Sequence, residues 1–399
     1  MAGLRDYLDQ LTESVISPVW SRVMAASWVA RAALLAIIVL AGSIAKYPAT
    51  AQGTWSEADV FSRLILWGAE PLPVRHSLYD TIARNQARLV QTIQSDLLPA
   101  KLDNVRGTPW STAQAIFGLG GEHVDTNIVV PFIRNNGSPL CGRACWAEIP
   151  NSPDTEPCIV VSGWVMAALA QLGIAATPEE LDFLLSHQNR NDGWWATFLG
   201  TSDSESLAST YSTAWAILGL AEQKRRKLIP PDRMPAVDQS IILGANWLVQ
   251  HMSSPARWKN YPNLAAGTES ESISGVALHA LHVSNVLATD NLDQQWLDRL
   301  PRRQVLVSDG EKNYVELHTA NRVYFDHWVQ IKLPWLLIAT LDAFHRGDVW
   351  QQSRALHWIE GEMNDPSVAT AYSVDDGWWR AELLRSLNSA LAASQPSRT

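Results

Sequence analysis

The sequence predicts an all-α protein in which helical hairpins close into an (α/α)6 toroid, preceded by a single N-terminal transmembrane helix. Three observations predict this fold. Helix starts recur at a nearly constant period, small residues gather on every second helix, and a long uncharged stretch lies near the amino terminus. A repeat of this kind bears on the fold before any other argument. The candidate helix starts, separated by 50, 51, 61, 52 and 50 residues, are Gln114, Trp164, Trp215, Val276, Trp328 and Trp378.

The composition fits one large folded domain. Of the 399 residues, 47% are hydrophobic and 18% are charged, which is typical of a globular chain with an ample core. Tryptophan is unusually frequent, with 19 residues against 8 tyrosines and 7 phenylalanines, and such flat side chains fill helical cores or line apolar and sugar-binding cavities. The net charge of −9 counts against nucleic acid as a partner, because nucleic-acid-binding proteins usually carry a basic face.

The amino-terminal region is predicted to contain two segments: residues 1–22 are amphipathic, and residues 23–47 form a transmembrane helix. A span needs about 20 apolar residues, so this one is long enough only if Arg31 is tolerated within it. A central arginine costs roughly 2.5 to 3.5 kcal/mol, and intramembrane charges usually have partners, which suggests a membrane-protein partner. A cleaved signal peptide is the alternative. A slight excess of basic residues before the span favours a large domain outside the cytoplasm, anchored in a membrane of the bacterial inner-membrane type.

The predicted toroid domain covers residues 55–393, and residues 394–399 form a disordered tail. Helix boundaries follow from caps, first-turn prolines and terminating glycines. The roughly 35 residues after Gly121 are predicted to be a loop that folds over one end of the ring, since so long a structureless connection is unusual in a compact domain. The predicted helices are 55–67, 77–98, 109–119, 161–172, 178–187, 212–220, 237–252, 274–283, 292–300, 327–344, 349–363 and 377–393.

Two classes of helix alternate along this domain. Helices at the repeat phase are rich in Ala, Gly, Ser and Leu, as in 162–164, 213–215 and 274–276, whereas the helices between them carry more charge. Small residues allow close helix approach, so the first class is predicted to be inner and the second outer. Six such hairpins can close into a ring. An open solenoid is the alternative, although common two-helix repeats, at about 34 to 47 residues, are shorter.

The three cysteines, Cys141, Cys145 and Cys158, cluster in and beside the Pro- and Gly-rich segment 135–157. This clustering predicts one disulfide that closes the loop in an oxidising compartment, with one thiol left over. Unpaired cysteines are an alternative, and a zinc site completed by His123 is a weaker one. The sequence predicts no cofactor and no metal site.

The turn Gln188-Asn189-Arg190-Asn191-Asp192-Gly193-Trp194 resembles the Q-x-x-x-D-G-x-W repeat signature of the terpenoid cyclase and protein prenyltransferase toroid superfamily, the squalene-hopene cyclase-like proteins. Residues 374–378 form a partial second copy, and the resemblance in spacing extends from about residue 108 to residue 391. In that family the signature ties a helix end to the adjacent turn. The resemblance therefore implies the toroid fold, and it implies that Gln188, Asp192, Gly193 and Trp194 are a structural clasp.

The catalytic motifs of that superfamily do not carry over. Class II cyclases protonate an alkene with an Asp-x-Asp-Asp motif, of which residues 373–376 keep only Asp375 and Asp376. Protein prenyltransferases bind zinc through Asp, Cys and His in an inner-helix setting, whereas all three cysteines of this chain precede residue 161. The resemblance thus implies a fold and an apolar or isoprenoid-like ligand without implying either activity.

Acidic side chains near the predicted inner-helix starts are the candidates for chemistry. Two similar loops, 200–206 and 267–272, each lead into an inner helix, and ring closure would gather their acids at one mouth of the ring. The candidate catalytic residues are Asp326, His327, Asp375 and Asp376. The candidate binding residues are Asp203, Glu205, Glu269, Glu271, Trp164, Trp215, Trp328 and Trp378.

Several interpretations of these acids stay open. Paired carboxylates in a Trp-lined cavity suit glycoside hydrolysis, with the two carboxylates about 5 to 10 Å apart. The same acids suit a metal or a cationic ligand, or they are ordinary helix caps and dipole partners. His327 beside Asp326 is a candidate general base or a hydrogen-bonded structural histidine.

Three functions follow as hypotheses. The chain is a membrane-anchored toroid that binds, with or without transforming it, an apolar or isoprenoid-like ligand; an extracytoplasmic carbohydrate-active enzyme that binds a glycan; or a non-catalytic scaffold that docks a partner protein. An axial cavity filled by tryptophan side chains would weaken both enzymatic interpretations.

Overall fold

The computed structural model describes residues 107–121, 124–148, 157–199, 207–264, 267–301, 310–318, 323–363 and 378–394, together with Val90, Ile93, Gln94 and Leu98. All of these belong to one compact unit, Leu78–Thr399. Within these ranges no helix combines the length and the apolar character that crossing a membrane requires. The predicted amphipathic segment 1–22 and transmembrane helix 23–47 lie outside the described residues, as does the predicted helix 55–67 and most of 77–98.

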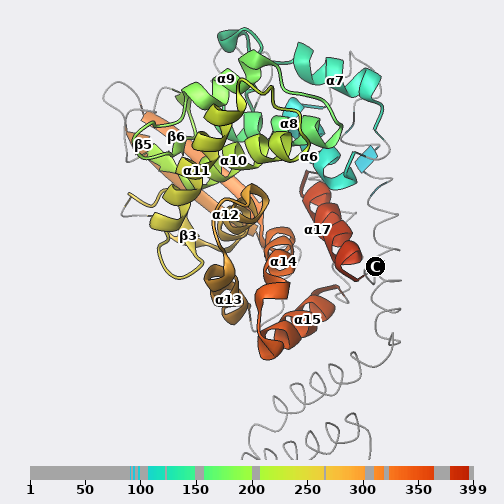
Figure 1. The fold of residues 1–399 in the computed structure, drawn as a ribbon, viewed down its shortest axis with the longest axis vertical. Helices are drawn as coiled ribbons and strands as arrows, with labels where there is room; N and C mark the ends of the chain where they lie inside the picture. Colours follow the sequence, from blue (N-terminus) through green and yellow to red (C-terminus); the bar gives the residue numbers. More distant parts are fainter. Residues whose placement is uncertain are drawn as a thin grey trace, which may run out of the picture. The chain divides into compact units, whose positions relative to one another are not determined.

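The described chain is mostly helical, as predicted (Figure 1). Six helices, which we call the inner helices, contact one another in cyclic order, the last of them contacting the first. They are α6 (Pro109–Leu119), α8 (Ile159–Gln171), α10 (Thr210–Arg225), α12 (Glu271–Ser284), α14 (Lys332–Ala343) and α17 (Trp378–Ser394). The closing contact between α17 and α6 includes a hydrogen bond of 2.9 Å from Asn388 Nδ2 to the Gly118 carbonyl oxygen.

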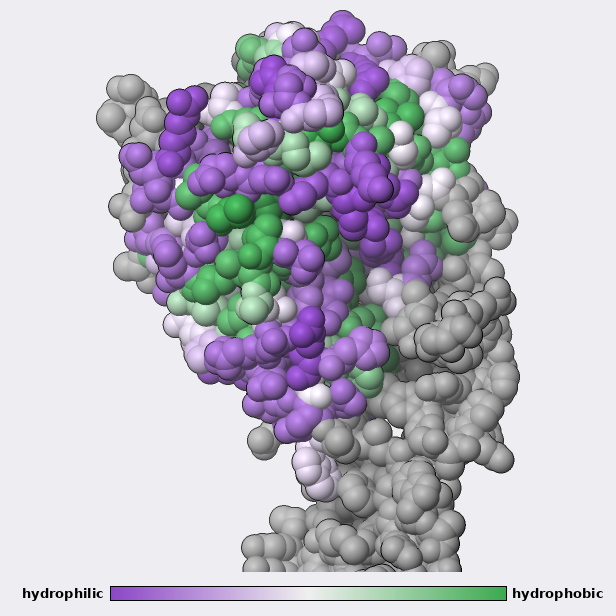
Figure 2. Space-filling model, viewed as in Figure 1, coloured by the Kyte–Doolittle hydropathy of each residue, from purple (hydrophilic) through white to green (hydrophobic). Residues whose placement is uncertain are grey.

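The other long helices alternate with the inner ones along the chain, and we call them outer helices. They are α7 (Thr126–Asn135), α9 (Pro178–Ser186), α11 (Met234–Gln250), α13 (Asp290–Asp298) and α15 (Val349–Met363). Each outer helix from α7 to α13 contacts an inner helix next to it in the chain, and the surface in Figure 2 is largely hydrophilic, with hydrophobic residues showing between polar ones.

Burial separates the two classes of helix as the sequence predicts. Every residue of α8 is buried, whereas α9 and α13 bury one face only. Close approach explains the small residues. A Cβ atom on Gly163 would lie 2.4 Å from the Trp215 carbonyl oxygen, and one on Gly275 would lie 2.5 Å from that of Trp335. Only glycine therefore lets α8 meet α10, and α12 meet α14, at these distances.

Local caps place the helix boundaries close to where the sequence predicts them. Thr108 and Ser111 form a reciprocal capping box at the start of α6, with Pro109 as the first helical residue and Gly120 in the left-handed conformation after the last. Thr177 caps α9 in the same way, through Glu180. The predictions for 109–119 and 178–187 are confirmed to within one residue.

The predicted helix 327–344 is wrong in its first part. Residues Gly310–His318 (β5) and Val323–Ile331 (β6) form an antiparallel hairpin, and α14 begins only at Lys332. The stretch 323–331 is rich in β-branched and aromatic residues, which favour a strand. Trp328 therefore lies in a strand and is not an inner-helix start, and Trp335 on α14 takes the place that the repeat period assigned to it.

The predicted loop after Gly121 also contains structure. Helix α7 occupies residues 126–135 and is capped by Asp125, whose side chain accepts a hydrogen bond from the Asn127 backbone N–H. Pro131 stands inside this helix, and a proline in the middle of a pattern normally indicates a helix end. The first hairpin thus has an ordinary outer helix.

The cysteines form one disulfide within that segment, between Cys141 and Cys145, whose Cα atoms are 6.0 Å apart. The Cys158 thiol is buried at the start of α8. In the described ranges no group of His, Cys, Asp and Glu side chains is placed to hold a metal ion. His123, the candidate fourth zinc ligand, lies outside them.

Three buried tryptophans repeat one pair of hydrogen bonds, which we call the tryptophan clamp. In each, the backbone N–H donates to a hydroxyl on the following inner helix, and the indole N–H donates to a carbonyl near the end of the preceding outer helix. The backbone bonds are Trp146 to Ser162, Trp195 to Thr213 and Trp258 to Ser274, at 3.2, 3.0 and 2.9 Å. The indole bonds are Trp146 to Ile133, Trp195 to Leu184 and Trp258 to Leu248, at 2.9, 2.8 and 2.7 Å.

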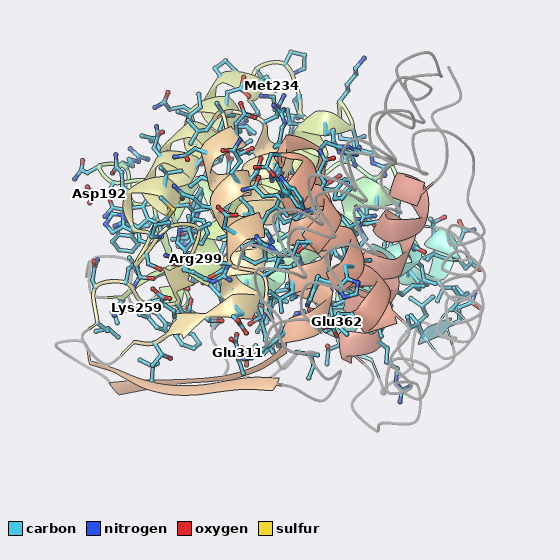
Figure 3. All side chains as sticks on the ribbon, turned by 90° about the horizontal axis from the view of Figure 1, so that it is seen from below. Asp192, Met234, Lys259, Arg299, Glu311 and Glu362 are labelled. Atoms are coloured by element: carbon cyan, nitrogen blue, oxygen red, sulfur yellow. A yellow bond between two sulfur atoms is a disulfide. The ribbon has the colours of Figure 1, made fainter. Side chains whose placement is uncertain are left out.

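The turn after α9 has the structural role that the resemblance implies, with some differences in its parts. Gln188 Nε2 donates to the carbonyl oxygens of Gly193 and Ser240, at 2.8 and 2.9 Å, and Ser240 Oγ donates back to Gln188 Oε1. The clasp therefore also reaches the next outer helix, α11. Trp195 rather than Trp194 supplies the indole hydrogen bond, and Asp192 is exposed at the outer edge (Figure 3).

Candidate functional site

Four aromatic side chains meet where the inner helices surround a common centre. We call Phe117, Trp164, Trp215 and Trp335 the central aromatic cluster. The Trp164 and Trp215 rings stack with centroids 3.5 Å apart, and the Trp164 and Trp335 centroids are 6.3 Å apart although α8 and α14 are not neighbours in the cyclic order. The side chains of all four are at most 2% exposed. At this level the middle of the helices is filled rather than hollow.

A polar cluster adjoins the aromatic one toward the starts of the inner helices. It consists of Gln114 on α6, Tyr211 on α10, Gln330 at the end of β6 and Glu382 on α17. Trp335 Nε1 donates to Glu382 Oε2 at 2.8 Å, and Gln114 Nε2 lies 3.5 Å from Glu382 Oε1. Residues far apart in the sequence thus meet at one end of the central aromatic cluster.

Burial dominates the electrostatics of this polar cluster. It raises the pKa of Glu382 from 4.5 to about 8, against the opposing effect of the hydrogen bonds from Trp335 and Gln114. Burial, together with the charge of Glu382, also raises the pKa of Tyr211. At neutral pH the site therefore holds a protonated carboxylic acid and a neutral phenol, both of which can donate a hydrogen bond.

Buried polar atoms surround the Tyr211 hydroxyl. The indoles of Trp164 and Trp215 and the amide of Gln330 lie near enough to hydrogen-bond it and so to lower its pKa, but within the described residues none of these atoms has a well-aligned partner. Gln330 is only 3% exposed. Each buried group left unsatisfied costs about 1 to 3 kcal/mol, so such groups in a folded protein call for a water or a ligand. Tyr211 as a whole residue is half-buried, whereas its phenol group is buried among these atoms.

The β5–β6 hairpin lies against this end of the inner helices (Figure 3). Glu311 on β5 points toward the helices and accepts hydrogen bonds from the backbone N–H groups of Glu271 and Ser272, at 2.8 and 3.1 Å. The hydroxyls of Ser270 and Ser272 also donate to it. A carboxylate is favoured here because the exposed N–H groups and the dipole of α12 carry positive charge at its start.

Other contacts hold the hairpin on the helices. Val315 of β5 packs against the buried pair Leu207 and Tyr261, in the connections before α10 and α12. Lys332, directly after β6, lies with its Nζ 3.0 Å from Glu271 Oε2 and 3.8 Å from Glu311 Oε1. The hairpin therefore spans several inner-helix starts and contributes Gln330 to the polar cluster.

On the other side, polar groups of the later helix turns flank the aromatic cluster. His279 Nδ1 lies 2.6 Å from Asp342 Oδ2, and the Arg385 guanidinium is 4.9 Å from the centre of the Phe117 ring. Burial lowers the pKa of Arg385, while the charges of Glu222 and Asp342 oppose that shift. The aromatic cluster is thus enclosed by polar layers at both ends.

The predicted site residues fall into three groups. Glu269 lies in β4 (Glu269–Ser270), which pairs with β3 (Trp258–Lys259), and Glu271 is the first residue of α12 and pairs with Lys332. Trp164 and Trp215 belong to the central aromatic cluster. The remaining predicted residues have no described side chain: Asp203, Glu205, Asp375 and Asp376 lie outside the described ranges, and Asp326, His327, Trp328 and Trp378 are described by their backbone alone.

Sequence reasoning missed Tyr211, Gln330, Glu382 and Glu311. The available signal for Glu382 was a single acid inside a helix start that is otherwise rich in apolar and small residues, 381–384. Glu311 and Gln330 gave no signal of this kind, because no strand was predicted at either residue.

Comparison with known proteins assigns no family. A scan against protein-family models finds no match for this chain, and a search of the curated proteins likewise returns none.

Proposed function

We propose that the chain is a membrane-anchored α/α toroid of the squalene-cyclase-like repeat type that binds a small apolar ligand by a neutral, oxygen-bearing group at the starts of its inner helices. The cyclic contacts of the inner helices and their alternation with outer helices support the toroid. The uncharged stretch in 23–47 supports the anchor. In this proposal the known cyclase and prenyltransferase reactions are absent.

One observation carries the ligand-binding proposal: the indole N–H groups of Trp164 and Trp215 and the amide of Gln330 are buried around the Tyr211 hydroxyl, and within the described part of the chain none of them makes a well-aligned hydrogen bond. These groups, with the protonated Glu382, offer mainly hydrogen-bond donors. The charge that contributes to the pKa shift of Tyr211 is that of Glu382 in its ionised form, and among the described groups no cation contributes to that shift. A neutral carbonyl or hydroxyl oxygen fits such a donor set better than an anion does.

The filled centre limits where the ligand lies. The central aromatic cluster leaves no passage along the middle of the helices at its own level, so the ligand binds between this cluster and the β5–β6 hairpin. A protein-docking scaffold has less support. The large hydrophobic side chains exposed in the described part of the chain, Leu140, Ile242 and Trp350, lie on three different elements and do not form one patch on a single helix.

Native mass spectrometry of the full chain extracted in detergent tests this proposal. We expect a bound small molecule on the wild type, its loss in Gln330→Met, which removes both amide atoms while keeping the side-chain length, and its retention in Gln250→Met, a matched change at an exposed position. Wild-type protein without bound molecule, or equal occupancy in both variants, would contradict the proposal.

The raised pKa of Glu382 favours a second function, acid catalysis on a carbohydrate, whereas the aromatic side chains that fill the centre of the helices weaken it. A carboxylic acid that stays protonated at neutral pH in an aromatic setting can act as a general acid. Glycan hydrolysis that falls as pH rises through about 8, and that is abolished in Glu382→Gln, would support it. Unchanged hydrolysis in that variant, or none in the wild type, would exclude it.

A further inference from the structure

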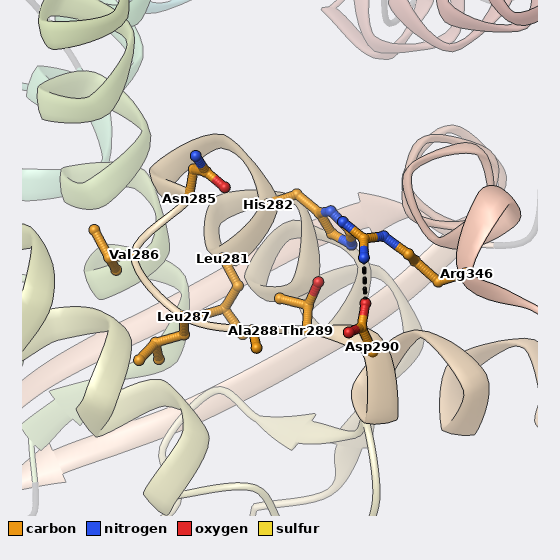
Figure 4. Close-up of a pocket in the computed structure, with 9 residues that line it drawn as sticks. All are labelled: Leu281, His282, Asn285, Val286, Leu287, Ala288, Thr289, Asp290 and Arg346. Carbon is orange, nitrogen blue, oxygen red and sulfur yellow. Dashed lines mark hydrogen bonds and ion pairs between the residues drawn. The ribbon is translucent and has the colours of Figure 1, made fainter.

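A pocket lies at the end of α12, where the chain turns toward α13 (Figure 4). This end of the helix is the one away from the polar cluster. At about 1.5 Å per helical residue, His282 is roughly 15 Å along α12 from Ser272 at the other end. The pocket has a volume of about 340 Å³, within the size range of small-molecule sites. Its lining consists of Leu281, His282, Asn285, Val286, Leu287, Ala288, Thr289, Asp290 and Arg346.

A buried carboxylate holds His282 at the wall of this pocket. Asp293, which is fully buried, accepts from His282 Nε2 at 2.7 Å and from Thr289 Oγ1 at 2.9 Å. Both carboxylate oxygens are thereby used, and the orientation of the imidazole ring is fixed. The ring lies beside the Arg346 guanidinium in Figure 4, and Nδ1 has no hydrogen-bond partner in the described part of the chain.

The surrounding charges favour the imidazolium form of His282. Burial alone would lower its pKa, but the hydrogen bond to Asp293 and the charges of Asp342 and Asp293 outweigh burial and the opposing charge of Arg346, so the pKa is raised. The position of His282 in the last turn of α12 acts in the same direction. A histidine whose pKa is raised and the guanidinium of Arg346 therefore both line the pocket.

The ion pair between Arg346 and Asp290 is exposed, so a ligand can replace Asp290 as the partner of Arg346. Arg346 Nη1 lies 2.5 Å from Asp290 Oδ1, but both side chains are more than half exposed, and an exposed ion pair contributes little to stability. Thr289 donates its hydroxyl to Asp293 and gives no side-chain cap to α13, so the first N–H groups of that helix also face this region without a cap.

We propose that this pocket binds an oxyanion, a phosphate or carboxylate group of a small molecule, between His282, Arg346 and the start of α13. The oxyanion accepts from His282 Nδ1–H and from the Arg346 guanidinium, whose planar donors match such groups. Asp290 competes with the ligand for Arg346. The site is separate from the proposed ligand site at the polar cluster and does not depend on it.

Thermal unfolding of the full chain with inorganic phosphate, sodium acetate or sodium chloride at matched ionic strength tests the proposal. We expect saturable stabilisation by phosphate at pH 6, and an affinity that falls several-fold as the pH is raised and His282 loses its proton. The charged groups facing His282 are Asp290 and Asp293 of α13, Asp342 of α14 and Arg346. Equal stabilisation by acetate and phosphate supports a ligand with a carboxylate group, and stabilisation by phosphate alone supports a ligand with a phosphate group.

Variants at exposed positions keep the test independent of folding. Arg346→Gln is expected to weaken phosphate binding about tenfold, whereas Asp290→Asn, which releases Arg346, is expected to strengthen it. Arg226→Gln, an exposed arginine at the end of α10, serves as the matched control and leaves the affinity unchanged. Equal stabilisation by phosphate and chloride, or equal affinity in Arg346→Gln and the wild type, would overturn the proposal.

Discussion

Replacing Glu382 with glutamine removes the ionisable group from the polar cluster with little change of shape. The glutamine carbonyl can still accept from Trp335 Nε1, which donates to Glu382 at 2.8 Å in the wild type. Glutamine does not titrate. The pH dependence that Glu382 confers on folding is therefore the main property that the variant loses.

The sign and size of the effect follow from the raised pKa. The Glu382 carboxyl group has a pKa of about 8 in the folded protein, against an ordinary value of 4.5 that applies in the unfolded chain. Between these pH values the folded state therefore binds more protons than the unfolded state. The stabilising effect is fully present below pH 4.5 and is lost as pH rises through about 8. At about 1.4 kcal/mol per pH unit, the wild type loses on the order of 3 kcal/mol between pH 5 and pH 7, relative to Glu382→Gln.

Urea-induced unfolding followed by tryptophan fluorescence at pH 5, 6, 7 and 8 measures this difference. Taking the wild type minus the variant at each pH cancels the titration of all other groups. Glu179→Gln, at an exposed position in the first turn of α9, is the control and should follow the wild type. Parallel profiles of wild type and Glu382→Gln across this range would refute the assignment of a protonated acid beside the central aromatic cluster.

Two further predictions concern the framework, and each is measured as the free energy of unfolding in urea. Gly275→Ala should lower the free energy of unfolding by about 1 to 3 kcal/mol, because the added Cβ would lie 2.5 Å from the Trp335 carbonyl oxygen. Gly361→Ala, whose Cβ would meet no neighbouring atom within 4 Å, should leave the free energy of unfolding unchanged or raise it by up to about 1 kcal/mol. Trp258→Phe should lower the free energy of unfolding by about 1 to 3 kcal/mol, because the Leu248 carbonyl loses its hydrogen-bond donor. Trp350→Phe, at an exposed tryptophan, is the control. An equally small loss in both variants would contradict a stabilising role for the tryptophan clamp.

The helices that the sequence predicts best are those whose ends are marked by local residues, such as a capping side chain or a terminating glycine. Caps and glycines delimit α6 and α9, and small residues such as Gly163 distinguish inner from outer helices. The error at 327–344 arose where the repeat period was extended over a segment whose residue types favour a strand. The repeat period correctly predicted an inner helix in this region, but it placed the start of that helix too early. Trp335, rather than Trp328, lies on the inner helix.

The polar cluster depends on contacts that no local pattern reveals. Gln114 and Glu382 are neighbours only because α17 packs against α6, and Tyr211 meets Gln330 only because β6 ends beside α10. The same holds for the tryptophan clamp, whose members are 10 to 18 residues apart and look like ordinary core residues in the sequence. The tryptophan content predicted either core filling or cavity lining, with core filling for most of these residues, and most described tryptophans do fill the core or join helices.

The position of the β5–β6 hairpin within the repeat argues that function lies at the starts of the inner helices. The connections before α10 and α12 contain ladders of two residues, β1 (Trp195–Ala196) with β2 (Ala208–Ser209), and β3 with β4. Before α14 the corresponding ladder grows to nine residues on each strand. Framework stability does not require this growth, because the earlier hairpins pack without it. Insertions in repeat proteins commonly map to the binding face, and this one brings Glu311 to the start of α12 and Gln330 to the buried polar groups around Tyr211 at the end of the central aromatic cluster.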